Sequence, residues 1–253
     1  MRTLLDYPRI VFVVSFLLFW GAALLGAYFR RYALPLDPDT RDDFGTVQAA
    51  ILTLLGLLIG FTFSMAVNRY DQRKNYEEAE ANAIGTEFLR VELLPPSDAE
   101  KLQQMLRAYL KQRMFFYTTR DSQQRREIDT RTTALQNDLW SGVRDRVAAQ
   151  PTPPMALVVS GMNDVLNSQG YTQAAWWYRI PTQAWNLMAL IAFACNLLIG
   201  YGARRRHPFL LLIVPLAVSM SFFLIADIDS PIGGLIQVRP QNLMSLDASL
   251  TPH

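Results

Sequence analysis

Four long segments of the chain contain no Asp, Glu, Lys or Arg, and this feature restricts the fold more than any other. A helix needs about 20 residues to cross a hydrocarbon core roughly 30 Å thick. Each of the four segments is about that long: Ile10–Phe29, Thr46–Val67, Pro181–Ala203 and Pro208–Ala226. The sequence therefore predicts an all-α integral membrane protein with four transmembrane helices.

The chain also carries a polar block between its second and third apolar segments, which raises the charged fraction to 18% beside 51% hydrophobic residues. The first apolar segment is interpreted as a retained span, because Arg30 and Arg31 follow it in place of a small-residue cleavage site. We expect four parts: transmembrane helices 1 and 2 (1–67), a helical soluble domain continuous with helix 2 (68–180), transmembrane helices 3 and 4 (181–226) and a C-terminal tail (227–253).

The second span shows no break at its polar end and is predicted to continue as a helix to about Leu94. The sequence LPPSD ends it, because proline lacks an amide donor and disfavours helix in the residue before it. Ser97 and Glu100 then form an S-x-x-E capping box, which predicts the start of another helix that runs to about Tyr117.

Two further helices are predicted in the polar block, one from about Arg126 to Ala149 after the loop TTRDSQQ, and a short one from about Pro154 to Asn167. The aromatic residues Trp176, Trp177 and Tyr178 follow. They are interpreted either as anchors at the membrane–water boundary or as residues buried in the soluble domain.

Small and polar residues recur along one face of the second span. Such residues let helices approach closely in lipid, so one interpretation is tight packing against a neighbouring helix. The other is a pore wall, in which hydroxyl and amide groups meet water and bulky side chains form a constriction. Both interpretations stay open, and they share the candidate residues Gln48, Thr53, Gly56, Gly60, Phe63, Ser64 and Asn68.

Oppositely charged residues follow this span at helical spacing. Arg73 with Glu77, and Lys74 with Glu78, are i,i+4 pairs that favour a helix by roughly a few tenths of a kcal/mol each. A continuous helix either transmits displacement between the membrane and the soluble domain or serves as a stalk.

Two stretches of the sequence carry a resemblance to known proteins. The order of spans, and NRYDQRKNYEEA after the second span, resemble bestrophin chloride channels. GFTFSMAVNRYDQRKNYEEAEANAIGTEFLRVELLP and ADIDSPIGGLIQV are more closely similar to a bacterial membrane family called bestrophin-like. The resemblance implies a homo-oligomer, with a pentamer as the expected state, and inorganic ions and membrane lipid as partners. It also implies a multi-pass protein of the bacterial inner membrane with its soluble domain in the cytoplasm.

Asp227 and Asp229 stand where the fourth span ends, before the turn-forming sequence SPIGG. In a symmetric oligomer they would make a negative ring that attracts cations. Alternatively, they form the turn by accepting hydrogen bonds from nearby backbone amides. No His or further carboxylate lies nearby in the sequence, so we expect no metal site here.

The sequence also argues against other functions. It lacks the HExxH, GxSxG, P-loop and GxGxxG motifs, so we expect no enzyme activity and no cofactor. A net charge of +2 with scattered arginines predicts no nucleic-acid partner. The predicted function is a homo-oligomeric ion channel with the second span lining the pore and the helical domain as a vestibule or gating element. The alternative is a non-conducting membrane scaffold or sensor whose helical domain binds a partner.

Overall fold

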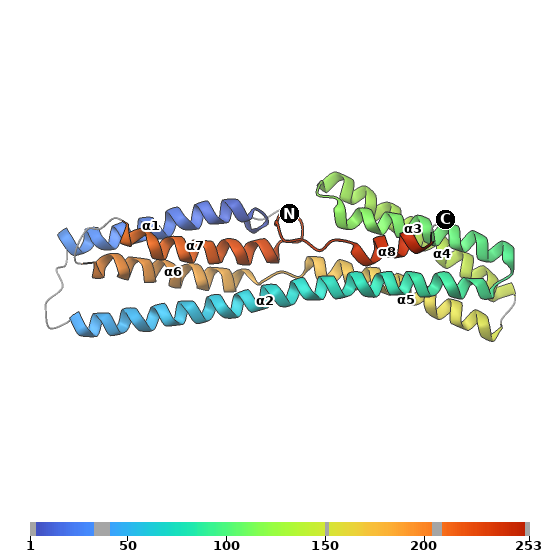
Figure 1. The fold of residues 1–253 in the computed structure, drawn as a ribbon, viewed down its shortest axis with the longest axis horizontal. Coiled ribbons are helices and arrows are strands. Elements are labelled where there is room, and N and C mark those ends of the chain that lie inside the picture. The colour runs from blue at the N-terminus through green and yellow to red at the C-terminus, as the bar shows by residue number, and fades with distance from the viewer. Residues whose placement is uncertain (1–3, 33–40, 150–151, 204–208, 251–253) are drawn as a thin grey trace. The chain divides into compact units, whose positions relative to one another are not determined.

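The computed structural model describes residues 4–32, 41–149, 152–203 and 209–250, and in these ranges it contains helices and no strand. The predicted all-α class is therefore confirmed. Eight α-helices are assigned within them (Figure 1), together with the short 3₁₀ turns η1 (Leu4–Asp6) and η2 (Val91–Leu93). The helices are α1 (Pro8–Tyr32), α2 (Arg41–Arg90), α3 (Pro96–Thr118), α4 (Ser122–Ala149), α5 (Pro153–Trp177), α6 (Thr182–Gly202), α7 (Leu210–Asp229) and α8 (Gln241–Leu250).

Within the described residues, four helical stretches are long and apolar enough to cross a membrane, which confirms the predicted number of spans. They are Pro8–Tyr32, Asp42–Leu93, Pro153–Gly202 and Leu211–Asp229. The predicted third and fourth spans correspond to α6 and α7. Arg204–Arg206 and His207, which follow the third span in the sequence, lie outside the described residues.

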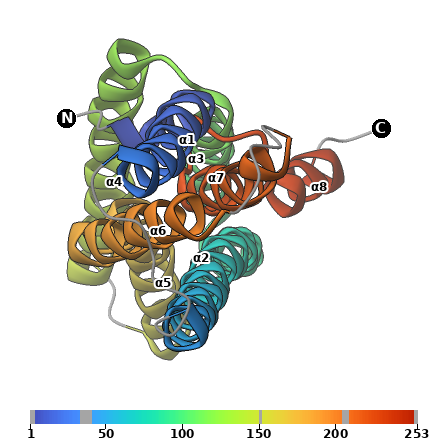
Figure 2. The ribbon, with the colours of Figure 1, turned by 90° about the vertical axis from the view of Figure 1, so that its left-hand side faces the viewer.

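The chain divides into two compact units, Met1–Tyr70 with Arg179–Gln237 (unit 1) and Asp71–Tyr178 with Val238–His253 (unit 2). Unit 1 holds α1, α6, α7 and the apolar part of α2. In Figures 1 and 2, α6 and α7 lie between α1 and this part of α2, which leaves α2 at one side of the unit. The C-terminal tail is shared, since its first part belongs to unit 1 and α8 belongs to unit 2.

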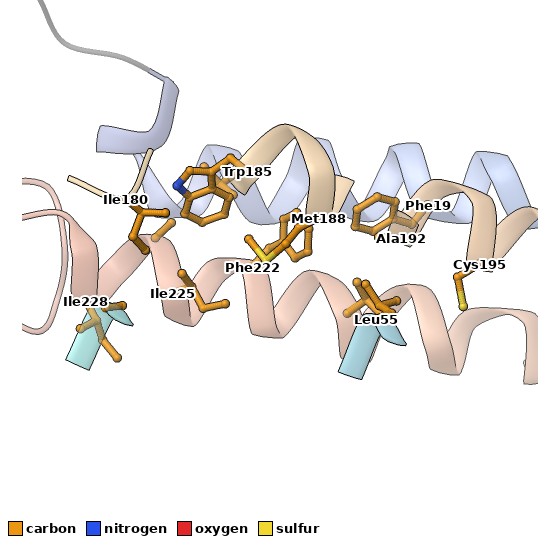
Figure 3. Close-up of a cluster of buried hydrophobic side chains, with 14 residues drawn as sticks. Phe19, Leu55, Ile180, Trp185, Met188, Ala192, Cys195, Phe222, Ile225 and Ile228 are labelled. Atoms are coloured by element: carbon orange, nitrogen blue, oxygen red, sulfur yellow. The ribbon is translucent and has the colours of Figure 1, made fainter. Parts of the chain in front are cut away.

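A continuous hydrophobic core holds unit 1 together. Phe19 of α1, Met188 of α6 and Phe222 of α7 are nearly or fully buried and face one another (Figure 3). Leu55 brings α2 into the same core with 1% of its surface exposed. Burying a side chain of this size contributes roughly 1.5–3 kcal/mol in water, and in lipid the same contacts act through close packing.

Glycine permits the close approach of α1 and α6. A Cβ added at Gly26 would overlap the carbonyl oxygen of Leu197, and one added at Gly200 would overlap that of Ala23. Backbone contact of this kind is the usual basis of helix association in membranes.

Unit 2 is a helical bundle built around α3. Its fully buried apolar residues include Leu106 and Leu110 of α3, Leu139 of α4 and Met162 of α5. These residues recur at helical spacing on each element, which is why the polar block folds as an amphipathic bundle.

The starts of two helices differ from the prediction. The predicted capping box at Ser97 is wrong, because α3 begins at Pro96 after Pro95 with no side-chain cap. Proline suits the first turn, where an amide would lack a partner. The loop predicted up to Gln124 is also wrong at its end: α4 begins at Ser122, where Asp121 Oδ1 accepts hydrogen bonds from the amides of Gln123 (2.8 Å) and Gln124 (2.9 Å).

The helix predicted to end near Asn167 is longer, because α5 runs from Pro153 to Trp177. Trp176 is buried, and its ring centroid lies 4.8 Å from that of Phe116. The interpretation as a buried residue is therefore correct for Trp176. Trp177 and Tyr178 are exposed, by 72% and 67%.

Candidate functional site

The apolar part of α2 has one face packed in unit 1. Leu55, Thr62 and Ala66 are buried at spacings of seven and four residues, which places them on one side of the helix. The hydroxyl of Thr62 donates to the carbonyl of Leu58 (2.8 Å), so this buried polar group is satisfied within its own helix.

The opposite face of α2 is open in the single chain. At about 100° per residue, Thr53, Gly60 and Ser64 lie roughly 140–180° around the helix from Leu55. All three are exposed. A Cβ added at Gly56 or Gly60 would meet no atom within 4 Å among the described residues. The close helix contact that these glycines allow is therefore made by no described part of this chain.

The other candidate residues of the second span divide between the two faces. Asn68 and Phe63 are exposed, Phe63 by 38%. Gln48 instead lies about 20° from Leu55 on the packed face, and its Oε1 is 3.0 Å from where a Cβ at Gly202 would stand. The structure thus groups Thr53, Gly56, Gly60, Ser64 and Asn68, with Phe63 beside them, and separates Gln48 from them. We call the five grouped residues, with Phe63 at their edge, the α2 outer face.

Three polar side chains lie on the α2 outer face: Ser64 and Asn68 are about one helical turn apart, and Thr53 lies about three turns before Ser64. Thr53 donates its hydroxyl hydrogen to the carbonyl of Ala49 (2.9 Å), so the hydroxyl oxygen can still accept hydrogen bonds. Ser64 and Asn68 add a hydroxyl and an amide. Such a surface can hydrogen-bond water and replace part of the hydration shell of an ion.

Asp227 and Asp229 form hydrogen bonds to backbone amides at the end of α7. Asp227 accepts from Leu235 (2.7 Å) and Ile236 (2.9 Å). Asp229 accepts from the amide of Ile180 (3.3 and 3.4 Å). The two residues are only 3% and 2% exposed. Asp227 therefore fits the turn-forming interpretation, whereas Asp229 ties the end of α7 to Ile180, which is distant in the sequence. The burial of both residues disfavours an exposed ring of charge.

Arg179 joins three parts of unit 1 near this turn. It forms an ion pair with Asp6 of η1 and lies 3.9 Å from Asp229. A Cβ at Gly233 would overlap the carbonyl oxygen of Asp6, so the turn must keep glycine there. Groups of three or more His, Cys, Asp or Glu residues arranged to hold a metal are absent from the described ranges.

Sequence reasoning missed a buried polar cluster in unit 2, around Glu80 of α2. Glu80 forms an ion pair with Arg113 of α3, and both side chains are 0% exposed. The carboxylate also accepts hydrogen bonds from the hydroxyls of Tyr117 (3.0 Å) and Thr172 (3.2 Å). Burial first, and then the charge of Glu80, raise the pKa of Tyr117. The cluster ties α2 to α3 and α5.

Glu77 makes a second link from α2, to the start of α8. Its Oε1 accepts from the backbone amides of Asn242 and Leu243, each at 3.0 Å, and its Oε2 accepts from the side-chain amide of Asn242 (2.6 Å). A carboxylate at a helix N-terminus is favoured by the helix dipole. Glu77 and Asn242 are too far apart in the sequence for a local pattern to reveal their contact.

These features define a class of protein: an all-helical membrane protein with four spans. Its second span has an open outer face, and the same helix continues into a helical bundle. Residues 17–243 match the family model described as the Bestrophin-like domain. The chain therefore belongs to the bestrophin-like family, which confirms the resemblance found in the sequence.

Solved structures show the same fold. A bacterial bestrophin homologue from Klebsiella pneumoniae is 13% identical, with a TM-score of 0.63, and the match covers 95% of this chain and 98% of that one. A single-substitution variant of the Klebsiella pneumoniae homologue matches at a TM-score of 0.65 with 12% identity, covering 94% and 96% of the two chains. Among curated proteins, no sequence gives a significant match.

Proposed function

We propose that the chain assembles as a homo-oligomeric ion channel in which the α2 outer face lines the pore and unit 2 serves as a vestibule or gating element. The observation that carries the proposal is the open space at Gly56 and Gly60, on the side of α2 opposite the unit 1 core. A symmetric ring of copies would enclose this face around an axis.

The polar residues of the α2 outer face indicate that this face lines a water-filled path and does not face lipid. Hydroxyl and amide groups in the hydrocarbon core usually face a bundle interior or a cavity, because lipid offers them no hydrogen bonds. Ser64 and Asn68 are exposed in the single chain, so copies of the chain or water must meet them. Phe63 is exposed at the edge of this face, about 100° around the helix from Ser64.

Membership of the bestrophin-like family supports the same proposal, because bestrophins are the channel family that the sequence resembles. The continuity of α2 supports a gating role for unit 2. At 1.5 Å per residue, its 50 residues extend about 75 Å, more than twice the thickness of a hydrocarbon core. Glu77 and Glu80 fix the polar half of this helix to α8, α3 and α5.

Cysteine modification in a planar bilayer tests the pore. Cys195, which is buried in α6, is first replaced by Cys195→Ala. Ser64→Cys is then compared with Met65→Cys, which lies about 100° around the helix. A charged, water-soluble thiol reagent is expected to reduce the current of Ser64→Cys at least several-fold and to leave that of Met65→Cys unchanged.

Equal block of both variants, or of neither, would contradict α2 as the pore wall. An assembled protein that passes no current at any voltage would favour the alternative, a non-conducting scaffold or sensor. That alternative would be pursued by identifying what binds unit 2.

We further propose that the protein resides in the bacterial inner membrane with unit 2 in the cytoplasm. This location requires no translocation of the polar bundle, which carries most of the charge of the chain. A C-terminal fusion to green fluorescent protein is expected to fluoresce, and a C-terminal fusion to alkaline phosphatase is expected to be inactive. The reverse result would place unit 2 outside.

A further inference from the structure

Glu87 of α2 is a buried carboxyl group with no hydrogen-bond partner. The residue is 0% exposed, and within the described residues neither Oε1 nor Oε2 is hydrogen-bonded. An ionised carboxylate in such a place costs several kcal/mol, so this group favours its protonated form. The bonds of the Glu80 cluster and of Glu77 do not involve it.

Helix α5 lies directly against this carboxyl group. A Cβ added at Gly161 would overlap Glu87 Oε2 and stand 2.6 Å from Nη1 of Arg90. Gly161 is itself buried. With Glu87 and Arg90 in these positions, only a residue without a side chain fits at position 161, and the packing leaves no room for the water that an ionised carboxylate would bind.

Two charged groups face Glu87, one from each helix. Arg90 lies one turn further along α2, and Asp164 lies one turn beyond Gly161 on α5. Nη1 of Arg90 is 3.9 Å from Oδ2 of Asp164. Arg90 favours the anion and Asp164 opposes it, and the effect of burial is larger than the effect of either charge.

The electrostatics agree with this geometry. Burial raises the pKa of Glu87 from its ordinary value of 4.5 to about 8, Arg90 acts against the increase and Asp164 adds to it. The group lies in unit 2, beyond the apolar part of α2.

We propose that Glu87 and Gly161 form a proton-dependent contact between α2 and α5, closed while Glu87 is protonated and opened by loss of that proton. The anion gains stability where water reaches it, and for water to reach Oε1 and Oε2, α5 must separate from α2 at Gly161. Direct pairing with Arg90, whose Nη1 already stands beside the same point of Gly161, would instead leave α5 in place. Separation of the two helices loosens the first half of α5. The proposal concerns unit 2 itself and holds whether or not the protein conducts ions.

The direction of the pH effect follows from linkage. The closed form binds a proton up to a pH of about 8, and the open form, with the carboxyl group in water, releases it above about 4.5. Opening therefore releases one proton in this window. The equilibrium constant for opening should rise roughly tenfold per pH unit between about pH 5 and 7.5 and level off above about pH 8.

Hydrogen–deuterium exchange on the full chain in lipid nanodiscs measures this opening. Protection of peptides that cover Pro153–Val165 is determined from pH 5 to 9 and corrected for the intrinsic exchange rate. In the wild type, protection should fall roughly tenfold per pH unit between about pH 5 and 7.5. Glu87→Gln, which keeps the shape of the group and cannot ionise, should hold its pH 5 protection throughout. Glu78→Gln, an exposed glutamate on the same helix, should follow the wild type.

Two more variants make the test independent of one substitution. Asp164→Asn removes the negative neighbour, so the pH at which the wild-type slope levels off should fall. Gly161→Ala should lower the protection of α5 already at pH 5, while Leu106 and its neighbours in α3 stay protected. Equal slopes in the wild type and Glu87→Gln, or no slope in the wild type, would overturn the proposal.

Discussion

Replacing Glu80 with alanine should destabilise unit 2 more than any change on its surface. The substitution leaves the guanidinium of Arg113 buried without its carboxylate. It also removes the acceptor of the hydroxyl groups of Tyr117 and Thr172. No other described group replaces these oxygens at the same point.

The size of the effect follows from this burial. Removing one partner of a buried ion pair costs about 3–5 kcal/mol, because the other charge stays desolvated. In a chain of this size, 1 kcal/mol changes the melting temperature by roughly 2–4 °C. Glu80→Ala should therefore lower the melting temperature of unit 2 by about 10 °C, from roughly 6 to 20 °C over the range of both values.

Thermal unfolding followed by circular dichroism in detergent measures the change, with Glu78→Ala as the exposed control on the same helix. The double variant Glu80→Leu with Arg113→Met should recover part of the loss, since it leaves no buried charge unpaired, while the hydroxyl groups of Tyr117 and Thr172 still lack their acceptor. If Glu80→Ala had the same melting temperature as Glu78→Ala, the cluster would contribute nothing to stability and the reasoning would be refuted.

Three further outcomes are expected. Gly60→Leu should narrow the pore and reduce the current in a planar bilayer and Gly21→Leu, which has equal space in α1, should not; equal currents would remove Gly60 from the pore wall. Asp227→Ala should cost about 1–3 kcal/mol by leaving two backbone amides unbonded, while ion selectivity stays the same; a change in selectivity with normal stability would restore the charged-ring interpretation. Replacing both Glu78 and Ala79 with glycine should cost about 1–2 kcal/mol of helix stability. It should also abolish any response of the current to changes in unit 2, whereas normal regulation would show that α2 is a stalk.

The spans and the all-α class could be predicted from the sequence because they depend on local properties. Uncharged segments of about 20 residues have few alternatives to a membrane helix. The unbroken course of α2 was equally local, since neither a proline nor a turn interrupts residues 41–90. The start of α4 was missed although its signal was present: Asp121 is a good N-cap residue directly before the helix.

The candidate residues were predicted less completely. The face that holds Gly56 and Gly60 follows from helical spacing, but the same spacing puts Gln48 beside Leu55, on the packed side. Glu80 and Arg113 are 33 residues apart, and no pattern in the sequence pairs them. The same holds for Glu87 and Gly161, because a charged residue in a polar helix is ordinarily solvated, and the burial of Glu87 against α5 depends on tertiary packing.

An image of the purified, assembled particle in a lipid nanodisc tests the central claim most directly, because it shows both the symmetry and the direction in which α2 points. The account predicts a closed ring of copies with Thr53, Gly60 and Ser64 turned toward a central axis and Leu55 turned away from it. A single copy, or a ring in which the α2 outer face is turned toward lipid, would contradict it.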